Sequence, residues 1–97
     1  MSRYYTRTQL IELLEVDEGF LVLLEREDVI ERDAPDDAKE DFSERMLERT
    51  RVAFNLVKEL EVNVPGAAII VRMREEMADL RHRVEQLLAE IDSSRRK

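Results

Sequence analysis

Apolar residues recur along this chain mostly at the three- and four-residue spacing of amphipathic helices. Thr6 and Gln9 fit a capping box for a first helix that continues to about Leu14. Asp17 is a suitable N-cap for a second helix that ends near Asp28. Two short helices joined by a tight turn are typical of a helix-turn-helix unit.

The middle of the chain mixes a short apolar run with a long acidic stretch. Val29–Arg32 has the composition of a short strand, whereas Asp33–Asp41 contains Ala-Pro-Asp-Asp and shows no apolar periodicity. We therefore expect a mobile acidic loop after the strand. Ser43 then caps a third helix over about Glu44–Glu61.

A heptad repeat dominates the C-terminal part of the chain. The sequence predicts a last helix over about Pro65–Asp92, and proline is tolerated in a first helical turn. Apolar residues follow one another there at alternating spacings of three and four, which is the seam of a coiled coil. We name these residues the seam and expect them to form a dimer interface: Ile70, Met73, Met77, Leu80, Val84, Leu87 and Ile91.

The seam pattern leaves two arrangements open. It favours pairing with a second copy, because one small domain has nothing long enough to cover so narrow and extended a stripe. The alternative is a helix that folds back over the third helix. A homodimer is the preferred prediction, and the pattern does not distinguish parallel from antiparallel chains.

Length and composition indicate one all-α domain with room for a single short β hairpin or wing. The chain has 97 residues, no cysteine, two glycines and two prolines, and 40% of its residues are charged. We divide it into a helix-turn-helix domain (residues 1–62), a coiled-coil helix (63–92) and a flexible basic tail (93–97). No early segment resembles a signal peptide and no apolar run is long enough to span a membrane, so we expect a cytoplasmic protein.

Acidic residues dominate the helix-turn-helix region. The segment Glu12–Glu48 holds 15 acidic and 4 basic side chains, a net charge of −11. Duplex DNA is a line of phosphates, so a DNA-reading face needs lysine and arginine. A basic protein surface is the better match, although an acidic surface can also serve solubility alone.

The second helix is apolar on almost all sides. Phe20, Leu21 and Leu24 are expected to enter the core, which leaves Val22 on the opposite side among charged residues. An exposed apolar residue ringed by charge is a reasonable contact centre. The predicted partner-binding residues are Asp17, Glu18, Val22, Glu25, Arg26 and Asp28.

The sequence gives no support for catalysis. His82 is the only histidine and has arginine on both sides, so it is expected to be solvated. No Glu-x-x-His pair, glycine-rich phosphate loop or nucleophile elbow occurs. We predict no catalytic residue, no metal site and no cofactor.

Several segments resemble the MerR-type winged helix-turn-helix family. Tyr5-Thr-Arg-Thr-Gln-Leu-Ile-Glu-Leu-Leu resembles the opening helix of that family, and Val16–Ile30 with its Glu-Arg-Glu resembles the second helix. Phe42-Ser-Glu-Arg-Met-Leu resembles the entry to the third helix. The DNA-binding members carry basic and aromatic residues in the second helix, where this chain has Gly19-Phe-Leu-Val, and a basic wing where this chain is acidic.

These departures are similar to the CbpM family of chaperone modulators, which have a MerR-like fold. The best local match is Asn63-Val-Pro-Gly-Ala-Ala-Ile-Ile-Val-Arg-Met, which precedes the coiled coil, and the resemblance spans about Tyr4–Leu88. It implies binding to the J-domain of a DnaJ-like, CbpA-type co-chaperone, and inhibition of that co-chaperone by covering its basic face.

Two rival functions follow from the same sequence. A MerR-type DNA-binding transcriptional regulator requires basic residues that the second helix and the wing lack. A purely structural coiled-coil subunit of a larger assembly predicts that partner binding needs only the last helix.

Overall fold

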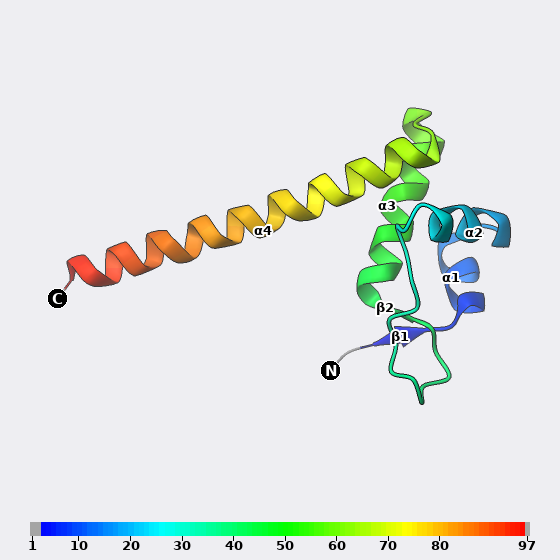
Figure 1. The fold of residues 1–97 in the computed structure, drawn as a ribbon, viewed down its shortest axis with the longest axis horizontal. Coiled ribbons are helices and arrows are strands. Elements are labelled where there is room, and N and C mark those ends of the chain that lie inside the picture. The colour runs from blue at the N-terminus through cyan, green and yellow to red at the C-terminus, as the bar shows by residue number, and fades with distance from the viewer. Residues whose placement is uncertain (1–2, 97) are drawn as a thin grey trace.

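The computed structural model describes residues 3–96, and these form the expected mainly helical class. Four helices and one pair of two-residue strands occur in this range, and the last helix leaves the remaining elements as a long rod (Figure 1). The overall dimensions of 56 × 36 × 20 Å reflect that projection.

The helix boundaries follow the capping residues that the sequence predicts. The helices are α1 (Arg7–Leu14), α2 (Glu18–Arg26), α3 (Glu44–Leu60) and α4 (Val64–Arg95). Thr6, Asp17 and Ser43 are the N-caps of the first three helices, as predicted, and Thr6 and Gln9 form both hydrogen bonds of the capping box. The cap of α4 is Asn63, which was not predicted as a cap, and its side chain accepts from the N–H of Gly66.

The end of α4 requires one correction. The helix continues to Arg95, so residues 93–95 of the predicted flexible tail are helical, and Lys97 lies outside the described residues. A long helix that is already hydrogen-bonded extends at little cost, because each added residue contributes one further bond.

The predicted strand at Val29–Arg32 is wrong. The strands are β1 (Tyr4–Tyr5) and β2 (Phe42–Ser43), which pair antiparallel with Tyr4 opposite Ser43. Val29 is 2% exposed, its backbone N–H donates to Leu24 and its carbonyl accepts from Arg49. Val29 and Ile30 therefore enter the core without pairing as a strand, and the backbone polar groups of Val29 are bonded to α2 and α3 instead.

One core joins all six elements. The first two helices contribute Leu10, Leu21 and Leu24, each with no exposed surface. Phe20 is half-buried and packs edge-to-face on Phe54 of α3, with ring centroids 5.4 Å apart. The remaining core side chains include Val29, Ile30, Phe42, Met46, Ala53, Ala67, Ala68 and Val71.

The acidic loop between the predicted strand and β2 is tied down by Arg32. The guanidinium of Arg32 donates to the carbonyls of Ala34, Pro35, Ala38 and Glu40, at 3.0–3.3 Å. The ends of the loop also meet, because the N–H of Asp33 donates to the carbonyl of Asp41. The loop is therefore a closed, internally bonded turn of chain, in place of the mobile segment that its composition predicts.

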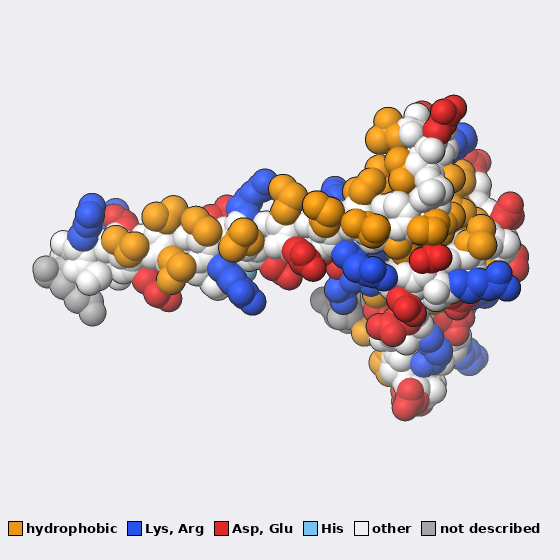
Figure 2. Space-filling view, turned by 45° about the horizontal axis from the view of Figure 1, so that its top comes forward, with side chains coloured by type: hydrophobic (Ala, Val, Ile, Leu, Met, Phe, Trp, Pro, Cys, Tyr) orange, Lys and Arg blue, Asp and Glu red, His pale blue; other side chains and the backbone are white. Residues whose placement is uncertain are grey.

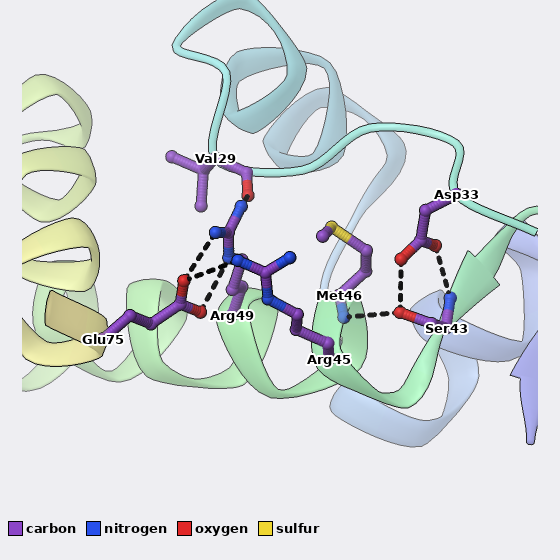
Figure 3. A network of polar contacts seen from close by, with 7 residues as sticks. All are labelled: Val29, Asp33, Ser43, Arg45, Met46, Arg49 and Glu75. Carbon is purple, nitrogen blue, oxygen red and sulfur yellow. Dashed lines mark hydrogen bonds and ion pairs between the residues drawn. The ribbon is translucent and has the colours of Figure 1, made fainter. Parts of the chain in front are cut away.

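The junction of α3 and α4 is fixed by a carboxylate in α4. Glu75 accepts from the Nε of Arg49 at 2.8 Å and from a second nitrogen of the same guanidinium at 2.5 Å (Figure 3). Arg49 also donates to the carbonyl of Val29 at 2.9 Å, and Arg45 donates to Glu75 at 3.0 Å. The guanidinium of Arg49 thus connects its own helix, α3, to Glu75 of α4 and to Val29, which follows α2.

This arrangement favours the ionised form of Glu75. Hydrogen bonds from Arg49, and then from Arg45, outweigh partial burial and lower the pKa of the Glu75 carboxyl from 4.5 to about 2. Because the folded-state pKa lies below that of the unfolded chain, the contribution to stability is complete above about pH 4.5. It is lost as the pH falls from there toward about 2.

Replacing Glu75 with glutamine is expected to destabilise the fold by about 1–2 kcal/mol at neutral pH. The figure is that of a charge-assisted hydrogen bond, reduced because a third of the side chain is exposed. Urea unfolding of both proteins, at one protein concentration and several pH values, measures the difference. It should shrink as the pH approaches about 2, the pKa of Glu75. A difference that does not change with pH would show that the charge of Glu75 contributes nothing.

Candidate functional site

Helix α2 is presented by a short turn between two well-defined helix ends. Glu15 ends α1 in the left-handed conformation with φ of 55°, and Val16 is buried. Asp17 then caps α2 by accepting from the N–H of Phe20 at 2.8 Å. Asp17, predicted as a partner-binding residue, therefore has a structural role at the start of the helix.

The side of α2 that faces the core is the predicted one, but the exposure of Val22 on the opposite side differs from the prediction. Leu21 and Leu24 are fully buried, as expected, and Phe20 is half-buried against α3. Val22 is half-buried too, so it is not the fully exposed centre that helical spacing predicts. Leu23 is 43% exposed and is the more accessible apolar side chain of this helix.

An arginine from α1 connects the two predicted carboxylates of α2. The Nε of Arg7 donates to Oε1 of Glu18 at 2.6 Å, and a terminal nitrogen donates to Oε1 of Glu25 at 2.6 Å. Hydrogen bonds first from Glu25 and then from Glu18 raise the pKa of Arg7 further above its usual range. The three side chains keep a net charge of −1, since two carboxylates face one guanidinium.

Arg7 is a residue that sequence reasoning missed. A basic side chain in the first turn of a helix opposes the helix dipole, and α1 has no acidic residue there. That mismatch is the signal that Arg7 needs carboxylates from another element. The bridge couples α1 to α2, so Glu18 and Glu25 hold the helix-turn-helix together as well as facing solvent.

The remaining predicted residues of α2 lie at its C-terminal end. Arg26 is exposed in the last turn, and Asp28 is exposed with φ of 57°. Asparagine and aspartate tolerate this left-handed conformation better than most residues. Of the six predicted residues, Glu18, Glu25 and Arg26 share α2 with Val22, while Asp17 and Asp28 flank it.

The seam is exposed over its whole length. Its seven side chains range from 37% exposed at Ile70 to 62% at Leu80. Ala67, Ala68 and Val71 are the residues of α4 that are buried against the domain, and every residue from 76 to 96 is exposed. The helix therefore does not fold back over α3, and Figure 2 shows apolar side chains along the rod.

Residues 3–96 contain no group of three histidine, cysteine, aspartate or glutamate side chains arranged to hold a metal ion. His82 is exposed on α4. Within the same range, no helix has the length and apolar character needed to cross a membrane.

Comparison with known proteins agrees with the architecture of these elements. The family model described as MerR HTH family regulatory protein matches residues 5–89. No curated protein and no solved structure gives a significant match. Since the family match covers α1 to α3 and most of α4, the chain belongs to the MerR family of helix-turn-helix regulatory proteins.

Proposed function

We propose that this chain is a non-catalytic adaptor that binds the J-domain of a DnaJ-like, CbpA-type co-chaperone and inhibits it. The observation that carries the proposal is the surface of α2, the second helix of the helix-turn-helix. This surface combines exposed Leu23 with the carboxylates of exposed Glu18 and half-buried Glu25, in a region with a net charge of −11. The resemblance to the chaperone modulators supports the choice of partner.

Charge complementarity supports a basic partner. The Arg7 bridge uses Oε1 of Glu18 and Oε1 of Glu25, so the other oxygen of each carboxylate is available to a donor from outside. Exposed Asp28 and Glu31 extend the acidic surface beyond the end of α2. Opposite charges accelerate association and select the partner, while the apolar centre contributes affinity. Covering the basic face of a J-domain inhibits it without any covalent step.

The seam supports a homodimer as part of the same proposal. Seven apolar side chains in one stripe, all at least 37% exposed, are more than an isolated helix keeps in water. A heptad seam pairs by inserting each residue between four residues of the facing helix. We propose that two copies pair through α4, which leaves both copies of α2 outside the coiled coil.

DNA-binding regulation is the second candidate, because membership of a family of helix-turn-helix regulatory proteins is compatible with it. The acidic residues of α2 oppose this function, since phosphate contacts depend on lysine and arginine. A salt-sensitive gel shift with promoter DNA, together with no binding to the J-domain, would support regulation of transcription instead.

Calorimetric titration of the wild-type protein with the J-domain of the host's CbpA-like co-chaperone tests the proposal directly. We expect saturable binding that weakens as salt is raised from low to moderate concentration. The absence of both heat and a complex in gel filtration would contradict the adaptor function.

Neutralising two acidic residues is expected to slow association. Glu18→Gln keeps an oxygen that accepts from Arg7, and Asp28→Asn keeps a side chain that tolerates positive φ. The double variant should associate with the J-domain about fivefold to tenfold more slowly at low ionic strength. Stopped-flow fluorescence measures the rate. The matched control, Asp79→Asn with Glu85→Gln on the side of α4 away from the seam, removes equal charge and should leave the rate unchanged.

Placing charge in the seam is expected to separate the dimer without unfolding the domain. Leu80 and Leu87 are 62% and 57% exposed in the protomer and lie outside its core, so Leu80→Glu with Leu87→Glu leaves the packing of the domain intact. Sedimentation equilibrium should then give the mass of one chain in place of two. His82→Glu with Ala89→Glu, on the opposite side of α4, is the control and should leave the mass at that of the dimer. An unchanged mass in the seam variant would contradict this interface.

A further inference from the structure

Helix α2 carries a second, outward face besides the one that enters the core. Gly19, Val22, Leu23 and Arg26 occur at positions i, i+3, i+4 and i+7, the spacing of one side of a helix. Gly19, Leu23 and Arg26 are exposed and Val22 is half-buried. The core of the domain uses the other side, through Leu21 and Leu24.

Nothing within the described chain requires glycine at position 19. Its φ is negative, and an added Cβ would meet only the Oδ1 of Asp17, at an ordinary contact distance of 3.4 Å. Gly66 in α4 provides the contrast, because a Cβ there would lie 2.9 Å from Oδ1 of Asn63 and 3.0 Å from a methyl of Val62. The structure gives Gly66 a reason to be glycine, whereas Gly19, the second residue of α2, stands where alanine would fit.

One use of a glycine on the surface of a helix is to permit the close approach of another backbone. The axes of packed helices lie about 8–10 Å apart, depending on the side chains at the contact. A missing Cβ permits an interaxial distance near the lower of these values. One turn further on, Leu23 provides the apolar side chain that such a neighbour would cover. The combination of an open backbone and an exposed leucine fits a helix better than a loop.

Charged side chains border this face along one side and at its C-terminal end. Glu18 and Glu25, held by Arg7, form an acidic edge, and Arg26 lies at the C-terminal end. A basic side chain of a docked helix suits the acidic edge, and an acidic group or helix C-terminus suits Arg26. A basic helix with a mixed-charge end is therefore the complementary partner.

We infer that Gly19, Leu23 and Arg26 are a helix-docking face, at which a basic helix of the partner crosses α2 with its backbone close to Gly19. This inference rests on the proposed function, because the partner helix is assigned to the J-domain. It adds that steric access at Gly19 limits affinity, independently of the acidic charge.

Gly19→Ala tests the inference because stability and binding should change in opposite directions. Alanine is the better helix former, so the midpoint of thermal unfolding should rise by about 2–4 °C. The added methyl separates the two helices, so the Kd for the J-domain should rise at least about tenfold, as an overpacked contact does. Calorimetry and thermal unfolding of the same preparations measure both quantities.

Two further variants separate this effect from its alternatives. Asn55→Ala improves an exposed position of α3 in the same way, and it should stabilise the protein without changing the Kd. Leu23→Gln removes the exposed leucine and should also raise the Kd, with a folded spectrum retained.

The outcomes distinguish the two proposals. If wild type binds the J-domain and Gly19→Ala binds equally well, the docking face is wrong while the adaptor function stands. If wild type does not bind, both fall. A Kd that rises for Asn55→Ala as much as for Gly19→Ala would assign the effect to helix stability and overturn the docking face.

Discussion

The carboxylate of Glu75 is the contact on which the arrangement of the helices depends. Two nitrogens of Arg49 donate hydrogen bonds to this carboxylate, and the third nitrogen of the same guanidinium donates to the carbonyl of Val29. Without it, α4 would be held by the limited apolar area of Ala67, Ala68 and Val71 and by one hydrogen bond from Arg72. A polar contact thus sets the direction in which an otherwise exposed helix leaves the domain.

Glu75 is also where the character of α4 changes. Before it, the helix is anchored to α3, and after it every described residue is exposed. Arg72 adds a second tie from this anchored part by donating to the carbonyl of Glu27 at 2.9 Å. The contacts that end α2 and those that begin α4 therefore overlap, so the orientation of α2 relative to the rod is defined within one protomer.

Local patterns in the sequence predicted much of the fold. The four helices, three of their caps and the uncovered seam follow from side-chain hydrogen bonding and from apolar periodicity, which act over a few residues. The prediction of a strand at Val29–Arg32 was wrong because Val29 and Ile30 are apolar in order to fill the core, and they do not pair with another strand. The prediction that the acidic loop is mobile did not anticipate that one arginine, Arg32, donates to four carbonyls of the loop. Composition alone cannot reveal such contacts.

The candidate site was less predictable for a related reason. Helical spacing identified the side of α2 that faces away from the core, but it did not reveal which carboxylates were already engaged. The Arg7 bridge joins residues 11 and 18 positions apart, and such contacts are set by packing of α1 on α2. Helical spacing also gave no reason to notice Gly19. Only the structure shows that the space around this glycine is open and that a larger side chain would fit there.

The two unpartnered surfaces of this protein differ in how they combine apolar and charged groups. The seam is long and apolar, and any two copies present the same stripe, so it suits self-association. The face of α2 is short and carries one exposed leucine bordered by an acidic edge and by Arg26. A surface of that kind gains little from pairing with its own copy, because its acidic edge would meet another acidic edge in many orientations. Its charge pattern instead favours a different, basic partner, and a shared coiled coil would present that pattern twice without covering it.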